Sequence, residues 1–472
     1  MNRAAARRTL FPLAFAVILA GGGCTSSGNQ PGDQAAGGAT GAGGATGAGG
    51  ATGTGGRTAV GGNPGAAGVT GSAGATGAPG AGGVTGSAGA RGAGGAPVTV
   101  GTGGARVVDA SAPDVPSAAP PFTASFHVGA DISWVQHDEH YGATYVDTDG
   151  VQKDILALLK NHGFNSVRLR TFVDPKASDG YDQVDGFADL PHTVTMAQRI
   201  KQAGMGLLIT LHYSDNWADP GKQCIPVAWQ QDTFAQLTQH VHDYTLNVIT
   251  TLKNAGVAPE LVQIGNEITP GMLIHICDSA GLPVSTNAVN GRASNWVNLG
   301  TLLKAGIQAV KEVDTRIKVV LHVDKGGDLA ASRSFITNAM AQNVPFDVFA
   351  DTSYVRWQGQ PSAWQNTFTT LATTYPNLSF IIPEYGNETA TSPATPSTMK
   401  IANDLIFNIA GNRGIGTWIY EPEHPAQSGI GIGLFQSTTV DGGIQDAWPV
   451  FTALPSAMSV YDQMKVTYAR RL

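Results

Sequence analysis

Eight short apolar runs, rich in β-branched residues, recur through roughly the last three quarters of this 472-residue chain. They alternate with segments whose apolar residues have helical spacing. A run that is apolar throughout is typical of a parallel strand buried on both faces. Eight strand–helix units in order therefore predict a (β/α)8 TIM barrel, an α/β fold, over residues 122–472. The predicted strands are Phe126–Asp131, Asn165–Arg170, Gly206–His212, Leu261–Gly265, Ile317–His322, Phe346–Ala350, Leu378–Ile382 and Ile415–Tyr420.

Three of the intervening helical segments carry a matching stop signal at Lys160–Gly163, Lys201–Gly204 and Lys253–Gly256. Each places a cation in the last turn and a glycine where a helix end needs a left-handed residue. No Gly-x-Gly-x-x-Gly opens a helix after a strand in this part of the sequence, so a dinucleotide-binding fold has no support.

The chain begins with the pattern of an export signal. Three arginines precede the apolar run Leu10–Ala20, which is too short to span a membrane as a mature helix, so residues 1–24 predict a secretory signal peptide. Cys24 resembles the lipid-modified cysteine of bacterial lipoproteins, although Gly21 stands where those proteins usually have Leu. We expect export, with Cys24 either lipidated or incidental to an ordinary cleaved signal.

Residues 25–121 consist mainly of Gly, Ala, Thr and Ser. Such a segment buries too little apolar surface to offset its ordering entropy, which predicts a flexible linker. Glycine nevertheless occupies every third position across 38–95 except at Ala59, as in a collagen triple helix. Proline fills the other positions only at Pro64 and Pro79, which favours a low-complexity spacer over a stable triple helix and leaves both open.

Two glutamates, Glu267 and Glu384, stand where apolar runs stop, 117 residues apart (384 − 267). The carboxyl ends of barrel strands are where (β/α)8 enzymes keep their reactive groups. Two carboxylates in one cleft suit hydrolysis of a glycosidic bond, in which one donates a proton and the other attacks or activates water. The alternative for each glutamate is a helix cap or an ion pair with arginine.

Other polar and aromatic residues follow the ends of consecutive strands, and together they predict a cleft for a sugar chain. The candidates for substrate binding are Asp131, Arg170, His212, Trp217, Asn266, His322, Tyr354 and Trp418. Arg168 and Arg170 share one face of their strand, and Arg170 lies nearer its C-terminal end. We expect Arg170 to keep Glu384 ionised as the nucleophile, Glu267 to act as the general acid and base, and Asn266 to donate to a sugar 2-hydroxyl.

Five segments match a known family in order along the chain: Gly129–Ser133, Val167–Arg170, His212–Gln223, Gly265–Ile268 and Leu321–Asp328. Over roughly residues 126–425 the sequence resembles the endo-β-1,4-galactanases of glycoside hydrolase family 53. The resemblance implies retaining hydrolysis of β-1,4-galactan or arabinogalactan of plant pectin, with Glu267 as acid and base and Glu384 as nucleophile. It implies no required cofactor. Some relatives hold a structural calcium in the loop after the eighth strand, where this chain has Asp441 and Asp446 without a dense carboxylate loop.

The sequence departs from the family near the substrate. The family's Ser-Tyr-Tyr-Pro and Trp-His-Gly are replaced by Ser353-Tyr354-Val355 and Trp357-Gln358-Gly359, and the nucleophile is followed by Tyr385 instead of Thr. The usual Tyr-Trp-Glu-Pro is Ile419-Tyr420-Glu421-Pro422, so a sugar-stacking Trp is either exchanged for Tyr420 or moved to Trp418. These changes leave the expected chemistry intact and leave the glycan open.

Cys224 and Cys277 follow the third and fourth predicted strands, so their loops share one barrel face. In an exported protein they form either a disulfide that braces these loops or two free thiols. No Cys-x-x-Cys or His-Glu-x-x-His is present, which disfavours a zinc site of those kinds.

Three functions remain open from the residues: an endo-galactanase, a retaining barrel glycosidase for another β-linked polysaccharide such as mannan, and a glycan-binding lipoprotein without turnover. The formal charge of −7 offers no basic footprint for nucleic acid. We expect a polysaccharide as the partner, a monomeric catalytic domain, membrane contact only through a lipid on Cys24, and a location outside the cell or anchored at the bacterial cell surface.

Overall fold

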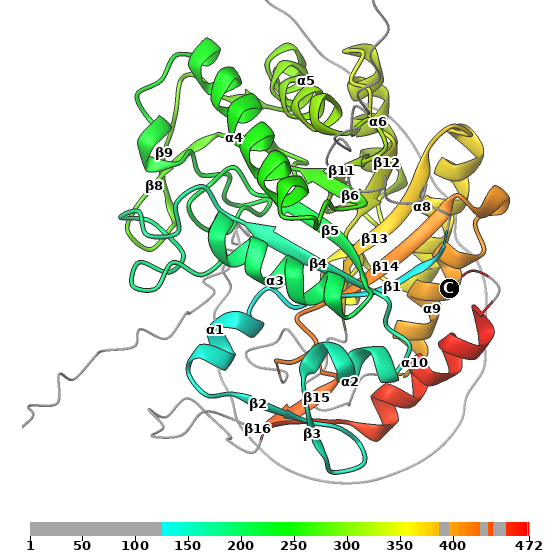
Figure 1. Ribbon diagram of the computed structural model, residues 1–472. Helices are drawn as coiled ribbons and strands as arrows, with labels where there is room; N and C mark the ends of the chain where they lie inside the picture. Colours follow the sequence, from blue (N-terminus) through cyan, green and yellow to red (C-terminus); the bar gives the residue numbers. More distant parts are fainter. Residues whose placement is uncertain (1–124, 387–395, 425–432, 438–449, 470, 472) are drawn as a thin grey trace, which may run out of the picture. The chain divides into compact units, whose positions relative to one another are not determined.

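Eight parallel strands close into a barrel in the computed structural model, which describes residues 125–386, 396–424, 433–437, 450–469 and 471 (Figure 1). They are the eight strands expected from the apolar runs, so the predicted (β/α)8 TIM barrel is confirmed. In order around the barrel they are β1 (His127–Asp131), β14 (Gly414–Tyr420), β13 (Ser379–Tyr385), β12 (Val348–Asp351), β11 (Lys318–Val323), β6 (Leu261–Ile264), β5 (Gly206–Leu211) and β4 (Ser166–Thr171).

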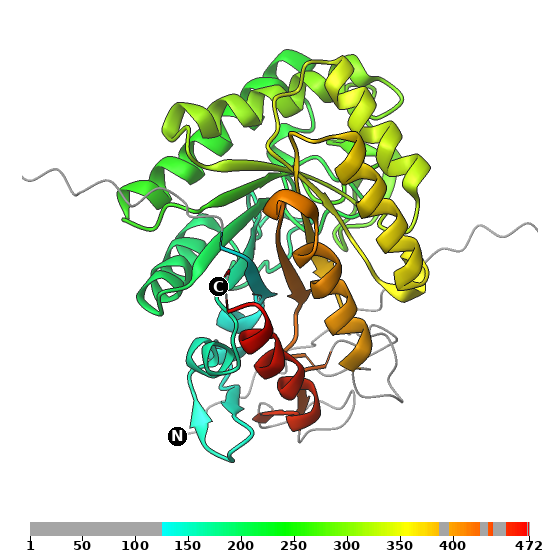
Figure 2. The ribbon, with the colours of Figure 1, turned by 90° about the vertical axis from the view of Figure 1, so that its right-hand side faces the viewer.

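The helices lie around the outside of the strands (Figures 1 and 2). Among them α3 packs against β4 and β5, α5 against β6, α8 against β13, and α9 against both β13 and β14. Their bounds are α2 (Ile155–Asn161), α3 (Leu190–Gln202), α4 (Phe234–Asn254), α5 (Trp296–Val313), α6 (Leu329–Ala341), α8 (Pro361–Thr374), α9 (Pro396–Phe407) and α10 (Pro455–Thr467). Helices α3, α5, α8 and α9 cover the barrel strands, while α10 packs against α9 and α6 against α8.

The expected helix stops are found at the ends of α2, α3 and α4. Gly163, Gly204 and Gly256 have φ values of +93°, +70° and +76°, a conformation that side chains with a Cβ rarely adopt. Each glycine lets the chain leave its helix and enter the next strand within a few residues.

The inside of the barrel is filled by apolar side chains from six of its strands. This interior cluster consists of Leu208, Leu261, Val320, Val348, Ala350, Ile381, Ile415 and Trp418. The Trp418 indole stacks on His127 with ring centroids 5.5 Å apart, and it covers Gly129 so closely that a Cβ there would lie 2.1 Å from Trp418 Cδ1. Trp418 has no exposed surface, so the expectation that it binds substrate is wrong: it is a core residue.

Short sheets and helical turns lie outside the barrel. Strands β15 (Phe435–Ser437), β16 (Val450–Ala453), β2 (Thr144–Val146) and β3 (Gln152–Lys153) pair in that order. Two further pairs join β7 (Gly271–Met272) to β10 (Gly291–Arg292), and β8 (His275–Cys277) to β9 (Pro283–Thr286). The remaining helical turns are α1 (Val135–His140), α7 (Val355–Gln358), Val227–Trp229 and Ala410–Asn412.

Cys224 and Cys277 form a disulfide, with their Cα atoms 5.8 Å apart. It joins the loop after β5 to strand β8, so of the two alternatives that the sequence left open the structure has the disulfide.

The predicted signal peptide, Cys24, the predicted linker, Asp441 and Asp446 lie outside the described residues. Within the described ranges, no helix combines the length and the apolar character needed to cross a bilayer.

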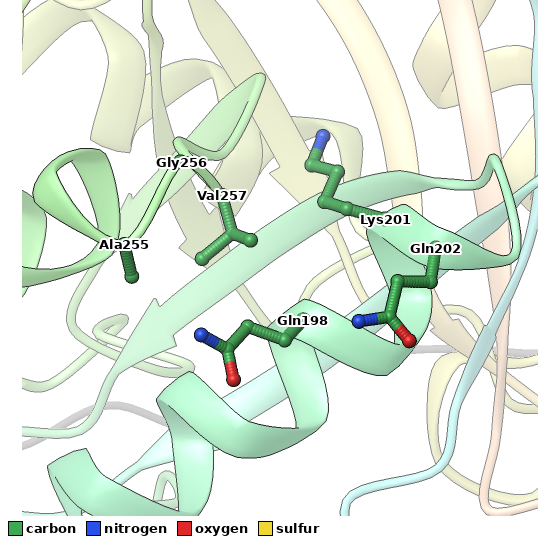
Figure 3. Close-up of a pocket in the computed structure, with 6 residues that line it drawn as sticks. All are labelled: Gln198, Lys201, Gln202, Ala255, Gly256 and Val257. Atoms are coloured by element: carbon green, nitrogen blue, oxygen red, sulfur yellow. The ribbon is translucent and has the colours of Figure 1, made fainter.

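A hollow lies at the opposite end of the barrel from Glu267, where β5 and β6 begin (Figure 3). It is lined by Gln198, Lys201, Gln202, Ala255, Gly256 and Val257. Its one charged side chain, Lys201, already pairs with Glu260 at 2.5 Å, and the lining offers no nucleophile or acid–base pair.

Candidate active site

Glu267 projects from a strained turn that follows β6. Gly265 and Glu267 have φ values of +77° and +47°, and positive φ is costly for a residue with a side chain. Tyr213 after β5 and Glu421 after β14 share this feature, with φ values of +51° and +40°. A strained backbone conformation persists only where the surrounding contacts hold it in place. Residues of this kind are common at functional sites.

Glu384, the penultimate residue of β13, is held by Arg168 of β4. Arg168 Nη2 lies 2.9 Å from Glu384 Oε1, and Arg168 Nη1 lies 2.7 Å from Asp131 Oδ2. The guanidinium also donates to Asn266 Oδ1 at 2.7 Å and to Thr210 Oγ1 at 3.0 Å. The Arg168 guanidinium therefore links the ends of four other strands. Arg168 is 1% exposed, so these contacts are largely shielded from water.

Arg170 does not occupy the place expected for it. Its Nη1 pairs with Glu421 Oε1 at 2.5 Å, and its Cζ lies 3.6 Å above the ring of Trp217. Residues two apart on a strand share a face but lie about 6.6 Å apart along it. The residue beneath Arg170, Arg168, therefore reaches Glu384, which corrects the expectation for Arg170.

Glu267 accepts a hydrogen bond from Thr352, with Thr352 Oγ1 2.7 Å from Glu267 Oε1. The same hydroxyl lies 2.8 Å from His322 Nε2, and His322 Nδ1 lies 3.1 Å from Asn266 Oδ1. A threonine hydroxyl has a single hydrogen. It can donate to Glu267 as a carboxylate, or accept from Glu267 as an acid and turn its hydrogen to His322.

The surroundings of the two glutamates differ in charge. Burial raises the pKa of Glu267 well above its usual range, and the nearby Glu384 and Asp324 carboxylates raise that pKa further. Burial also raises the pKa of Glu384, to about 7, while the Arg168 guanidinium opposes the rise. Glu267 is therefore suited to carry a proton, and Glu384 is the carboxylate that a cation stabilises.

Several predicted site residues lie beneath the cleft instead of facing it. Asp131 and His322 have no exposed surface, so they act through Arg168 and through Thr352 and Asn266. Burial, and then the Arg168 charge, lower the pKa of His322 well below its usual range, so its ring is neutral. The expectation that Asp131 and His322 contact substrate is therefore wrong; both are supports.

The other predicted residues have some surface at the site. His212 accepts from the Ala218 amide at 3.0 Å and is 4% exposed. The Asn266 amide donates to the Ala218 carbonyl at 2.9 Å. Tyr354 is near enough to Glu384 and Glu267 for their charges to raise the pKa of its phenol, although burial is the larger cause.

Two of the family departures are placed clearly. Tyr385 points away from the cleft, where its hydroxyl lies 2.9 Å from both Tyr461 Oη and Asn403 Nδ2. Tyr420 lies among Glu421, Arg170 and Glu384, whose charges act on its phenol. With Trp418 in the core, Tyr420 is the aromatic residue that stands at the cleft in the place of the family's tryptophan.

The candidate site residues taken from the sequence did not include Arg168, Thr352 or Glu421, although Glu421 is among the polar residues that follow strand ends. Arg168 carried a signal, because it shares a face with Arg170. Thr352 lies two residues after the predicted strand Phe346–Ala350, and Glu421 directly follows the predicted strand Ile415–Tyr420. Nothing in the spacing indicated which of them would meet Glu267 or Arg170.

Comparison with known proteins agrees with this geometry. Residues 127–405 match the sequence profile of glycosyl hydrolase family 53. A Niallia circulans protein described as "Uncharacterized protein in bgaB 5'region" is 39% identical over 251 residues, which cover 53% of this chain and 65% of that protein. The arabinogalactan endo-beta-1,4-galactanase of Thermothelomyces thermophilus is 28% identical over 333 residues, covering 66% of this chain and 93% of the relative.

Among solved structures, the Ignisphaera aggregans GH53 catalytic domain aligns with a TM-score of 0.60 and 27% identity. The alignment covers 72% of this chain and 97% of that domain. On the profile match, the barrel and the paired glutamates at its strand ends, the chain belongs to glycosyl hydrolase family 53.

Proposed function

We propose that this protein is a retaining endo-β-1,4-galactanase that hydrolyses galactan and arabinogalactan. The observation that carries the proposal is the unequal pair of glutamates, with a guanidinium on Glu384 and a single hydroxyl donor on Glu267. Membership of family 53 and similarity to a fungal arabinogalactan endo-beta-1,4-galactanase support the choice of substrate.

The reaction begins with Glu267 protonated and Glu384 ionised. Glu267 donates its proton to the glycosidic oxygen as the bond to the leaving sugar breaks, and Glu384 Oε attacks the anomeric carbon to form a glycosyl-enzyme ester. Arg168 holds the attacking carboxylate in place and disfavours its protonation. As Glu267 loses its proton, the Thr352 hydroxyl can donate to the new carboxylate.

In the second half of the reaction a water molecule replaces the leaving sugar. Glu267, now a carboxylate, takes a proton from this water as its oxygen attacks the anomeric carbon, and Glu384 leaves as a free carboxylate. Two inversions at the same carbon give net retention. The bond between two sugars is thereby exchanged for a hemiacetal and a hydroxyl group.

Proton NMR during hydrolysis of β-1,4-galactan tests both the substrate and the stereochemistry. We expect the β-anomer of the new reducing end to appear first and the α-anomer to follow by mutarotation. Early appearance of the α-anomer would contradict a nucleophilic Glu384.

A panel of galactan, arabinogalactan and β-mannan tests the choice of glycan by release of reducing ends. Highest kcat/KM on galactan supports the proposal. A preference for mannan would assign the barrel to another β-linked polysaccharide, and binding of galactan with no release would indicate a glycan-binding protein.

We further propose that the protein is exported and that Cys24 carries the lipid that holds it at the cell surface; the apolar run before Cys24 supports this. Detergent phase partitioning of the protein expressed in a bacterial host, compared with Cys24→Ser, tests the anchor. Equal partitioning of the two proteins into the aqueous phase would leave export without an anchor.

A further inference from the structure

Asp138, Glu423 and His424 form a cluster beside the active site that the proposed reaction does not use. Asp138 belongs to helix α1, and the other two residues follow β14. One ligand atom from each of the three residues lies within 4.8 Å of the other two. His424 Nε2 lies 2.9 Å from Asp138 Oδ2, so the cluster joins two segments that are 286 residues apart in the chain.

Glu423 is the member whose surroundings are incomplete. It has no exposed surface, and neither of its carboxylate oxygens has a hydrogen-bond partner within the described part of the chain. The phenol oxygen of Tyr145 is buried without a partner there too, close enough to Asp138 and Glu423 for their charges to act on it. A buried carboxylate without a donor is costly unless a proton or a cation neutralises it.

We propose that Asp138, Glu423 and His424 bind one divalent cation of the zinc type. One imidazole nitrogen with two carboxylate oxygens is a ligand set that Zn²⁺ accepts with water in a fourth position, whereas Ca²⁺ and Mg²⁺ prefer oxygen alone. The ion adds positive charge beside Glu423 and replaces the hydrogen bond between His424 and Asp138.

We expect the ion to have a structural role. The cluster lies beside Trp134 and Arg170, which form one wall of the cleft. The His424 ring centroid lies 5.5 Å from that of Trp134, and the Arg170 guanidinium lies 5.2 Å from the centroid of the Trp134 ring. Arg170 is the partner of Glu421, two residues before Glu423. A metal at the cluster therefore fastens the segment after β14 to α1 and steadies the wall around Trp134 and Arg170.

Isothermal titration of the whole chain with ZnCl₂, after dialysis against EDTA and then metal-free buffer, tests the proposal. We expect one equivalent of Zn²⁺ to bind with micromolar or tighter affinity, and CaCl₂ or MgCl₂ to bind at least about 100-fold more weakly. Zinc at about 100 times its Kd should raise the Tm by about 3–5 °C.

Two substitutions probe the ligands, and one provides a matched control. Glu423→Gln and His424→Gln should each weaken zinc binding at least about 100-fold and remove the rise in Tm. His242→Gln removes another histidine that lies between carboxylates, Asp243 and Glu312, but on the surface, and it should leave the one-site binding intact. Circular dichroism in the aromatic region shows whether each variant is folded.

The proposal is overturned if the folded wild type gives no saturable heat with ZnCl₂ up to about 1 mM. It is also overturned if both ligand variants bind zinc as the wild type does. An infrared carbonyl band of a protonated carboxyl group that disappears in Glu423→Gln and persists with excess zinc would likewise overturn it, because Glu423 would then be neutralised by a proton. None of these outcomes depends on turnover of galactan.

Discussion

Arg168 Nη2 lies 2.9 Å from Glu384 Oε1, and the same nitrogen lies 2.7 Å from Asn266 Oδ1, the residue before Glu267. One guanidinium therefore connects the two strand ends that carry the reactive glutamates. Because Arg168 is buried, its charge acts on Glu384 with little screening by solvent.

Arg168→Gln should reduce kcat/KM on galactan by about 10²- to 10³-fold, because the charge that keeps Glu384 ionised is lost. Burial already raises the pKa of Glu384 to about 7, and removal of Arg168 raises this pKa further. The nucleophile must be ionised, so the acidic limb of the pH profile of kcat/KM should move to higher pH. Arg170→Gln is the matched control: its partner is Glu421, so its acidic limb should move less. A larger shift in Arg170→Gln would contradict this assignment.

Alanine substitutions of the glutamates should separate their roles by chemical rescue. Glu267→Ala should lose about 10²- to 10⁴-fold in kcat, and Glu384→Ala should lose more. Sodium azide fills the space of the missing carboxylate. We expect the β-glycosyl azide from Glu267→Ala and the α-glycosyl azide from Glu384→Ala, identified by NMR. The opposite pair of products would exchange the two roles, and full activity in either variant would remove that residue from the mechanism.

Thr352→Val should move the basic limb of the pH profile of kcat/KM to higher pH. The Thr352 hydroxyl donates to Glu267 and stabilises its carboxylate form, so loss of the donor raises the pKa of Glu267. The acid must be protonated to react, and the limb therefore follows that pKa upward. The acidic groups facing Glu267 are Glu384, Asp324 and Asp219, and all remain in the variant.

Thr352→Ser retains the hydroxyl and should restore the wild-type profile. We expect kcat to fall by about three- to tenfold in Thr352→Val, the size expected for loss of one ordinary hydrogen bond. An unchanged basic limb in a folded Thr352→Val protein would show that the hydroxyl only packs against Glu267.

Cys224→Ser should destabilise the barrel by about 4 kcal/mol, the loop-closure value for a link across 53 residues. Urea unfolding followed by fluorescence measures this change. Reduction of the wild type with dithiothreitol should lower its stability to that of the variant, since both then lack the cross-link. If reduction leaves the wild type unchanged, the bond contributes little to stability.

Much of the fold could be predicted from the sequence because a parallel strand buried on both faces is an uninterrupted run of apolar residues. Two of these runs end at Glu267 and Glu384, and the carboxyl ends of parallel strands meet at one end of a barrel. The loops that carry Cys224 and Cys277 followed from the same rule. These inferences needed only the order of residues along each strand.

Which side chains meet across the barrel was decided by the tertiary structure. Period-two alternation places Arg168 and Arg170 on one face, but the stagger between β4 and β13 determines which of them lies level with Glu384. The register of β14 against β1 sets Trp418 level with Gly129 inside the barrel and Tyr420 level with Asp131, nearer the glutamates. The contact of Asp138 with His424 likewise required closure of β14 against β1. Sequence determined the strands and the residues at their ends; closure of the barrel, which sets the relative height of strands distant in the chain, determined the partners.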